Sequence, residues 1–238
     1  MINFQNLHLF GNKPYIDNKM RIISIHFPKA AGTSLRKQLK SHFRSSFLYY
    51  NNDPLTASGF ETVDDLPKGV KAVHGHFRAA RYDAVSNAFR FTFLRDPVEN
   101  LISIYYYWLT LRPFGHPWHD KFVSEKPSIL EFGKYGPLRC LMSEVYFGNY
   151  DMSRLDFIGF YETRARDLPR LGELIGVNLN VEYHTNRTRN TEAQAALKLD
   201  ESKKDALRTL LAEDVRFYEH QRSVRDAIAK TSAAASSS

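Results

Sequence analysis

The alternation of apolar strands with amphipathic helices limits what this 238-residue chain can fold into more than any other feature of its sequence. Residues 21–27 (RIISIHF) are rich in β-branched side chains and stop at Pro28, which predicts a strand. Residues 34–47 follow directly and place Leu35, Leu39 and Phe43 at four-residue spacing, which predicts an amphipathic helix.

The same alternation continues along the chain. Further strands are predicted at residues 69–75, 89–94 and 155–161, and further helices at residues 97–111, 138–147, 164–175 and 201–228. Irregular connections are predicted at residues 51–68, 112–137 and 181–190, which are polar or contain several Pro and Gly residues. This order predicts an α/β fold, with a central parallel sheet flanked by helices.

No Pro-, Gly- or Ser-rich linker and no internal repeat divides the chain, so we expect a single domain at residues 21–230. Residues 1–20 are expected to be an N-terminal extension, and the low-complexity residues 231–238 to be a disordered tail. Hydrophobic residues make up 43% of the chain, which is enough for a buried core and excludes an intrinsically disordered protein.

Three features favour a cytoplasmic protein without a transmembrane segment. The single Cys140 cannot form an internal disulfide. The longest near-continuous apolar stretch, residues 101–111, is shorter than the about 20 residues that a transmembrane helix needs. The first twenty residues lack the uninterrupted apolar core of a signal peptide.

The net charge of +7 indicates a mild preference for anionic partners. Its Lys and Arg residues are scattered, and the chain has no basic run of the kind that binds nucleic acid through counterion release. We therefore expect no nucleic-acid partner and look to individual motifs for an anion site.

The first motif, PKAAGTS at residues 28–34, lies between the first predicted strand and its helix. Such a turn presents backbone N–H groups and the positive end of a helix dipole to an anion. The candidate ligands are Lys29, Ala31, Gly32, Thr33 and Ser34. A Walker A loop would place the Lys after the second Gly, which this motif does not do. The same residues also fit an ordinary tight turn with an exposed lysine.

The second motif is Arg95-Asp-Pro97 followed by Ser103. Arg95 ends a predicted strand, at the carboxyl edge of the sheet where α/β proteins bind ligands. Asn100, Ser103 and Tyr107 share one face of the following helix by their spacing. Arg95 and Ser103 could hold a phosphate through charge-assisted bonds. Taken alone, the pair fits better an arginine that caps the sheet edge and a serine that fills a helix contact.

The third motif is His74-Gly75-His76. Residues two apart on a strand point to the same face, so both imidazoles would lie together, with Gly75 leaving room between them. Imidazole is the usual general base at neutral pH. The lone cysteine and the absence of a matching carboxylate cluster predict no metal site here. His116 and His119 are interpreted as surface or lid residues.

Together, these motifs resemble the sulfotransferases that use 3′-phosphoadenosine 5′-phosphosulfate (PAPS), and among them the carbohydrate branch that contains the heparan sulfate 2-O-sulfotransferases. Residues 28–34 resemble the family's 5′-phosphosulfate loop, and Arg95-Asp-Pro with Ser103 resembles its 3′-phosphate segment. His74-Gly-His76 matches the paired histidines at the acceptor in the 2-O branch. The resemblance extends from about Arg21 to Tyr218, and Asn100 stands where many relatives carry Arg.

The resemblance implies a fold like that of P-loop nucleotide kinases and transfer of a sulfuryl group from PAPS to a hydroxyl acceptor, a saccharide, without a metal. It implies that Lys29 neutralises the leaving oxygen, that Arg187 clamps the nucleotide, and that His76 is the general base. His74 would orient that base or bind the acceptor.

Two other functions stay open at this level. A P-loop-type kinase would use ATP and would need Mg²⁺ ligands and a Lys after the glycine. A non-catalytic nucleotide- or glycan-binding module would keep the phosphate loops and tolerate loss of the histidines.

Overall fold

Five parallel strands form the central sheet, as the alternation of elements predicts. The computed structural model describes residues 20–56, 62–181 and 192–235. The strands are β1 (Arg21–Ile25), β2 (Phe47–Tyr49), β3 (Ala72–Gly75), β4 (Ala88–Leu94) and β5 (Phe157–Phe160), in the spatial order β2-β3-β1-β4-β5. β1 lies at the centre, with Ser24 opposite His74 of β3 and Ile25 opposite Thr92 of β4.

The edge strand β2 is the one strand that the hydrophobic pattern missed. The helix predicted over residues 34–47 is α1 (Gly32–Phe43), and it ends because Arg44 takes a positive φ of 51°. A short 3₁₀ turn follows, and the β-prone Phe47-Leu-Tyr49 then pairs with β3. Amphipathic spacing that continues past Phe43 hides this change from helix to strand.

The local signals at helix ends predict their positions well. α2 (Pro97–Trp108) begins as expected, because Pro97 occupies its first turn and the Asp96 carboxylate accepts a hydrogen bond from the Glu99 N–H at 2.9 Å. It ends near Trp108, before the predicted residue 111. α6 (Arg164–Ile175) matches its predicted range and stops at Gly176, whose φ of 65° suits glycine.

The predictions for the rest of the helical part need correction. The expected irregular segment 112–137 contains α3 (Pro117–Glu125) and α4 (Ile129–Phe132) and the start of α5 (Gly136–Arg139). Residues Leu141–Tyr146, expected in an α-helix, form a π-helix. The single stretch expected at 201–228 is two helices, α8 (Glu201–Leu210) and α9 (Ala212–Ala235), preceded by α7 (Glu192–Leu199). α9 therefore continues into residues 231–235, where a disordered tail was expected.

Aromatic packing stabilises the segment that was expected to be irregular. The ring of Phe132 lies 5.2 Å from that of Trp108 and 5.1 Å from that of Phe122, both in edge-to-face contact. Phe132 and Phe122 are almost completely buried. Pro117 and Pro137 stand in the first turns of α3 and α5, where proline suits a helix, and the buried rings hold these short helices together.

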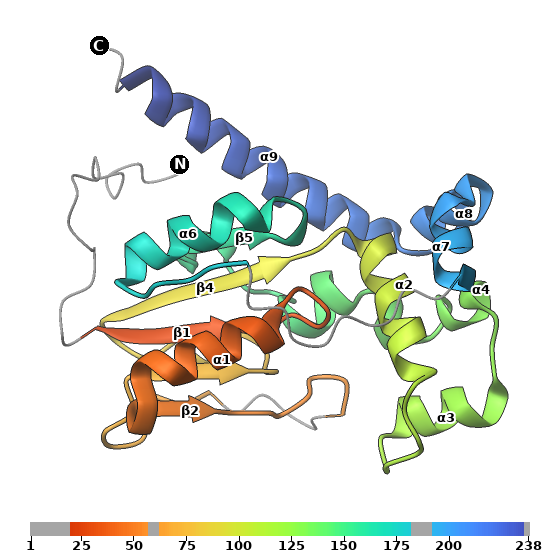
Figure 1. Ribbon diagram of the computed structural model, residues 1–238, viewed down its shortest axis with the longest axis horizontal. Helices are drawn as coiled ribbons and strands as arrows, with labels where there is room; N and C mark the ends of the chain where they lie inside the picture. Colours follow the sequence, from red (N-terminus) through yellow and green to blue (C-terminus); the bar gives the residue numbers. More distant parts are fainter. Residues whose placement is uncertain (1–19, 57–61, 182–191, 236–238) are drawn as a thin grey trace.

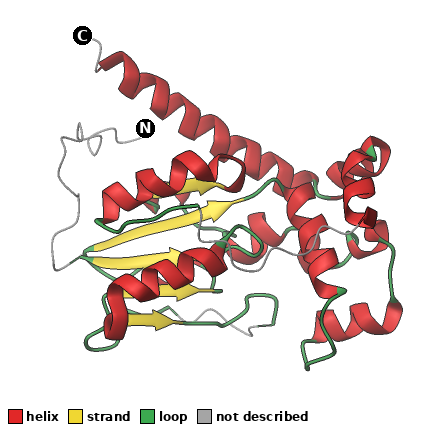
Figure 2. Cartoon of the chain, in the orientation of Figure 1, coloured by secondary structure: helices red, strands yellow, loops and turns green. Residues whose placement is uncertain are grey.

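All five strands point in one direction, and several of the helices gather beyond their carboxyl ends. Figure 1 shows α2, α3, α4, α7 and α8 grouped on that side, with α1 and α6 in front of the sheet; the same layers are visible in Figure 2. The chain leaves β1 toward β3 and β2, and leaves β4 toward β5, on the opposite side. The carboxyl ends of β1 and β4 therefore form the switch point at which α/β sheets bind ligands.

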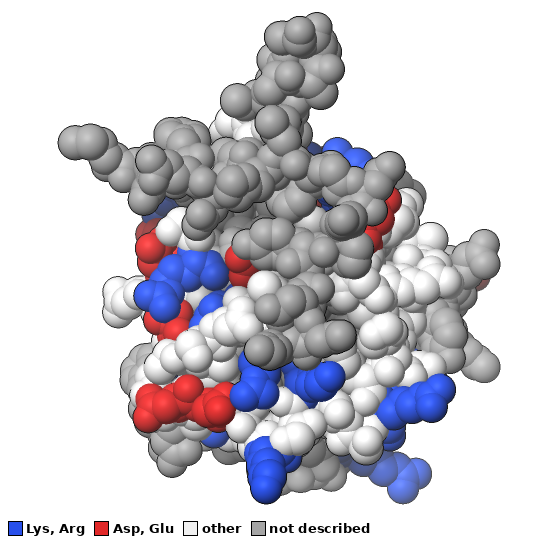
Figure 3. Space-filling model, turned by 90° about the vertical axis from the view of Figure 1, so that its left-hand side faces the viewer, with Lys and Arg blue, Asp and Glu red and all other residues white. Residues whose placement is uncertain are grey.

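The opposite side of the sheet, where the strands start, carries charges of both signs. Figure 3 views this side, and Lys and Arg side chains lie there beside Asp and Glu side chains. The Arg21 guanidinium at the start of β1, for example, pairs with the Asp65 carboxylate at 3.2 Å. Among the helices in the described ranges, none is both long and apolar enough to span a membrane.

Replacing Gly75 by Ala tests how closely the chain packs at the end of β3. A Cβ atom at Gly75 would lie 1.5 Å from the Tyr50 carbonyl oxygen, a backbone atom that cannot rotate away. We expect Gly75→Ala to lower the free energy of unfolding by about 3 kcal/mol or more. Gly136→Ala is the control, because nothing lies within 4 Å of its added Cβ, and it should change stability by less than about 0.5 kcal/mol. Urea unfolding curves measure both, and equal curves would contradict the prediction.

Candidate functional site at the carboxyl edge of the sheet

The loop between β1 and α1 has an unusual backbone. Lys29 and Ala31 both have positive φ angles, 56° and 69°, which costs non-glycine residues about 1 kcal/mol each. Ala31 is the N-cap residue of α1 and provides no side-chain cap for the N–H groups that follow. The first turn of α1 begins with Gly32, Thr33 and Ser34, and it directs backbone donors and the positive end of the dipole toward this edge. This backbone has the form of an anion-binding nest.

Two side chains from the second motif hold this strained loop in place. The Arg95 guanidinium donates to the Lys29 carbonyl at 3.0 Å, and the Asn100 amide donates to the Pro28 carbonyl at 2.6 Å. Both side chains are buried, and each satisfies a carbonyl that no strand or helix would otherwise pair. The structure therefore brings the first and second motifs together, at the switch point between β1 and β4.

The Lys29 ammonium lies on the α2 side of the loop. Its Nζ is 4.1 Å from the centroid of the Tyr107 ring. Burial, together with the charge of Arg95, lowers the pKa of Lys29 to about 8. Ser103 is buried on the same α2 face, between the positions of Asn100 and Tyr107. The α2 face that Lys29 contacts through Tyr107 therefore also carries Ser103, four residues earlier.

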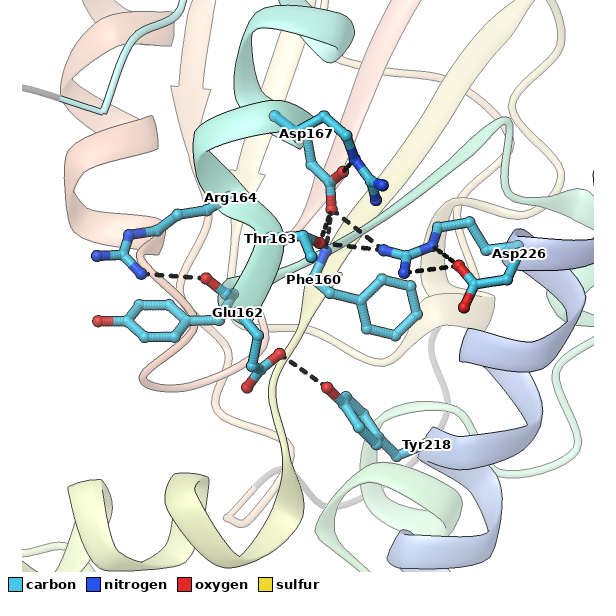
Figure 4. Close-up of polar contacts among 10 residues, drawn as sticks. Phe160, Glu162, Thr163, Arg164, Asp167, Tyr218 and Asp226 are labelled. Atoms are coloured by element: carbon cyan, nitrogen blue, oxygen red, sulfur yellow. Dashed lines mark hydrogen bonds and ion pairs between the residues drawn. The ribbon is translucent and has the colours of Figure 1, made fainter. Parts of the chain in front are cut away.

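On its other side, Arg95 packs against the segment that follows β5. The Tyr161 ring lies between two guanidinium groups, those of Arg95 and Arg164, each 4.2 Å from its centroid. The Glu162 carboxylate accepts a hydrogen bond from the Asp96 N–H at 2.9 Å and another from the Tyr218 hydroxyl of α9 at 2.7 Å; Figure 4 shows the second contact. The ends of β4 and β5 and the last helix are therefore joined through one side chain.

A second set of contacts fixes α9 beside α6. The buried Asp167 carboxylate accepts from the Phe160 N–H at 2.9 Å and from the Thr163 hydroxyl at 2.6 Å. It also pairs with Arg225 of α9 at 3.4 Å, and Arg225 holds Asp226 at 2.8 Å (Figure 4). These bonds hold the Tyr161-Glu162 segment where Tyr161 contacts Arg95 and Glu162 accepts from the Asp96 N–H.

The two predicted histidines lie together, although the role of the glycine between them differs from the expectation. His74 is fully buried and its Nδ1 is 2.7 Å from the Ser24 hydroxyl on β1. His76 follows the end of β3, and its Nδ1 is 2.9 Å from the Tyr146 hydroxyl of the π-helix. The space beside Gly75 accommodates the Tyr50 carbonyl and not the two rings, so that part of the interpretation was wrong.

A third histidine, His26, joins this pair and was missed. Its ring stacks on both neighbours, with centroid distances of 4.9 Å to His74 and 4.1 Å to His76. It was hidden because His26 ends an apolar strand and is separated by nearly fifty residues from its partners. Ser24 and His26 alternate with isoleucines, which indicates a shared face, but only the pairing of Ser24 with His74 shows what that face meets.

The three imidazoles are uncharged at neutral pH. Burial, and then the neighbouring His76, lower the pKa of His74 to about 3. Burial also lowers the pKa of His76, against an opposing effect of the Asp53 carboxylate. Burial alone would raise the pKa of Asp53. The hydrogen bonds to His116 and the Leu55 N–H, together with the charges of His76 and His116, outweigh burial and lower the net pKa, so Asp53 stays ionised beside His76. Of the two predicted histidines, His76 is therefore the stronger base.

The segment 112–137 contributes to this site through His116. Its Nε2 lies 3.4 Å from the Asp53 carboxylate, and its Nδ1 accepts from the His119 N–H to cap α3. His119 is completely buried, with its Nε2 3.2 Å from the Trp108 carbonyl. The interpretation of His119 as a surface or lid residue was thus wrong. The three-residue spacing of His116 and His119 is that of a helix N-cap and the residue whose N–H it accepts.

Ser34 and Arg187 were also predicted to bind the nucleotide. The Ser34 hydroxyl accepts a hydrogen bond from the Gln38 amide at 3.3 Å. Arg187 lies outside the described residues. In the part of the chain that the structure describes, no three His, Cys, Asp or Glu side chains form a metal-binding group.

Comparisons with known proteins leave the assignment to the site itself: no family model and no curated protein matches this chain.

Inorganic sulfate tests the loop as an anion site, because its charge does not change between pH 7 and 9. Lys29, with a pKa of about 8, carries its positive charge below that pH and loses it above. We expect sulfate affinity to fall about tenfold from pH 7 to pH 9 in the native protein. Lys29→Arg should remove this fall, since arginine stays charged, whereas Lys29→Met should bind weakly at both pH values. A calorimetric titration with the same pH dependence in all three proteins would contradict the assignment.

Proposed function

We propose that this protein transfers a sulfuryl group from PAPS to a hydroxyl group of a saccharide, on a fold like that of P-loop nucleotide kinases. One observation carries the proposal: the strained Lys29 loop and the neutral histidines lie at the same edge, where Gly32 packs against His26. An anion-binding turn next to a neutral base suits transfer of an anionic group to a hydroxyl. The resemblance of the three motifs to PAPS-dependent sulfotransferases supports the same reaction.

In this proposal, the loop binds the 5′-phosphosulfate. Backbone N–H groups from Ala31 to Ser34 face its oxygens, and Lys29 adds a positive charge. Arg95 and Ser103 hold the 3′-phosphate, whose presence distinguishes PAPS from ATP. The lowered pKa of Lys29, caused by burial and by the charge of Arg95, supports a loop at which positive charge is concentrated. Arg187 as a clamp on the nucleotide stays a prediction of the resemblance.

The transfer itself moves one proton and one sulfuryl group. The acceptor oxygen attacks sulfur, an O–S bond forms, and the bond from sulfur to the 5′-phosphate oxygen breaks. His76 takes the proton of the hydroxyl, and the adenosine 3′,5′-bisphosphate leaves with the electron pair of the broken bond. Lys29 stabilises the negative charge that develops on that leaving oxygen. The acceptor gains the sulfuryl group, and no metal is part of the proposed step.

His76 suits the role of base better than His74 for two reasons. His74 is fully buried with a pKa of about 3, so it binds a proton too weakly to take one from a hydroxyl. His76 is partly exposed, lies one residue beyond β3, and has the ionised Asp53 nearby to stabilise its protonated form. The Tyr146 hydroxyl, 2.9 Å from Nδ1, holds the His76 ring in place.

Nucleotide preference tests the donor. A 3′-phosphate held by charge-assisted bonds should raise affinity, and we expect adenosine 3′,5′-bisphosphate to bind at least about tenfold tighter than AMP. Arg95→Ala should remove most of this preference, whereas Arg208→Ala, an exposed arginine of α8 paired with Asp205, should leave it unchanged. Calorimetry gives the affinities. Equal binding of both nucleotides to the native protein, or tighter binding of ATP with Mg²⁺, would contradict the sulfotransferase and favour a kinase.

Turnover and its pH dependence test the base. We expect His76→Ala to lower kcat by about 10²-fold or more, because unassisted loss of the hydroxyl proton is slow, while donor affinity changes only a few-fold. His74→Ala should lower turnover less. Because the pKa of His76 is below its ordinary 6.5, the native rate should rise with pH and level off before neutrality. Labelled PAPS with a panel of saccharides measures these rates. Near-native kcat in His76→Ala would show that another group takes the proton.

A further inference from the structure

His26 occupies the middle of a stack of three imidazole rings. Its ring plane is inclined by 21° to that of His74 and by 25° to that of His76. The closer contact, with centroids 4.1 Å apart, is to His76, the base of the proposed reaction. A ring that lies face to face with a base contacts it in both of its protonation states.

The surrounding backbone holds His26 in this position. Its N–H donates to the Gly75 carbonyl at 2.8 Å, which ties the end of β1 to the end of β3. On the other side, a Cβ atom at Gly32 would lie 1.9 Å from the Cδ2 and Nε2 atoms of the ring. Glycine is therefore the residue that lets the first turn of α1 lie against the imidazole. The His26 ring has little freedom to leave the stack.

His26 itself is a neutral ring in this environment. Its Nδ1 is buried and has no hydrogen-bond partner among the described residues. Burial, and then the neighbouring His76 and other positive groups, lower the pKa of His26 well below its ordinary value. A neutral aromatic face attracts a cation placed over it, and this attraction grows where water is excluded.

The groups around His76 determine how readily its ring takes up a proton. Asp53, after β2, is anionic and favours the proton, and so does a hydrogen bond to the His26 backbone. Arg36 of α1 disfavours the proton, Tyr146 of the π-helix bonds Nδ1, and His74 of β3 is neutral. Burial opposes the charged ring, so stacking on a neutral ring would add a further contact that stabilises it.

We propose that His26 is a positioning residue that stabilises protonated His76 by stacking its neutral ring on the imidazolium. The inference rests on the proposed role of His76 as the base. His26 takes no proton itself; it makes His76 a better base and holds its ring in the plane that Tyr146 also fixes. Because Gly32 packs on the same ring, His26 contacts both the Lys29 loop and His76.

Substitutions that separate the ring face from the ring nitrogens test the proposal. His26→Leu removes the aromatic face, and His26→Phe keeps a face and removes both nitrogens. In proteins labelled at the histidine ring carbons, NMR titration should give a lower pKa of His76 in His26→Leu and a value restored toward native in His26→Phe. At pH 6, kcat should fall several-fold to about thirtyfold in His26→Leu, as expected for loss of a cation–π contact, and stay within about threefold in His26→Phe.

Controls keep the outcome clear. His42→Leu alters an exposed histidine at the end of α1 and should change neither quantity. A cooperative thermal unfolding curve shows that each variant is folded, and His26→Gln, polar but not aromatic, replaces His26→Leu if that protein does not fold.

An unchanged pKa of His76 in His26→Leu would overturn the proposal. Equal loss of turnover in both His26 variants would also overturn it, by showing that a ring nitrogen of His26 takes part. The NMR titration needs no substrate, so it decides the stacking role even if the sulfotransferase reaction is not found.

Discussion

Two hydrogen bonds to consecutive carbonyls determine the shape of this site. Asn100 and Arg95 hold the Pro28 and Lys29 carbonyls, and between them they keep Lys29 and Ala31 in backbone conformations that non-glycine residues avoid. Every other part of the site is placed relative to this loop: Lys29 itself, the first turn of α1, and the glycine that lies on His26. The sheet supplies the rigid edge on which such strain is maintained.

The Lys29 loop and the three stacked histidines meet because β1 is the central strand. One neighbour, β4, contributes Arg95, and the other neighbour, β3, contributes His74 and leads into His76. Arg95 and the Lys29 ammonium therefore lie toward β4 and α2, and the neutral imidazoles lie toward β3. Burial favours this separation, since it lowers the pKa values of the histidines and keeps further positive charge away from Lys29.

The sequence predicted the parts of this structure that local rules decide. Strand and helix alternation, the Asp96 cap and the Pro97 start all follow from neighbouring residues. It did not predict β2, because Phe47 continues the helical spacing although pairing with β3 decides its state. Nor did it show His26, whose partners depend on the register of Ser24 against His74, or the buried His119, which depends on aromatic packing around Trp108. Register and long-range packing have no local signature.

The two hydrogen bonds of the Glu162 carboxylate affect the order in which parts of the chain can fold during synthesis. One of its oxygens accepts from Asp96 and the other from Tyr218, which lies 122 positions further along the chain than Asp96. During synthesis, all three motifs leave the ribosome well before α9 does. Until Tyr218 and Arg225 arrive, the Tyr161-Glu162 segment that backs Arg95 lacks its outer support. A nascent chain would thus contain all three motifs before the last helix supports the segment that packs against Arg95.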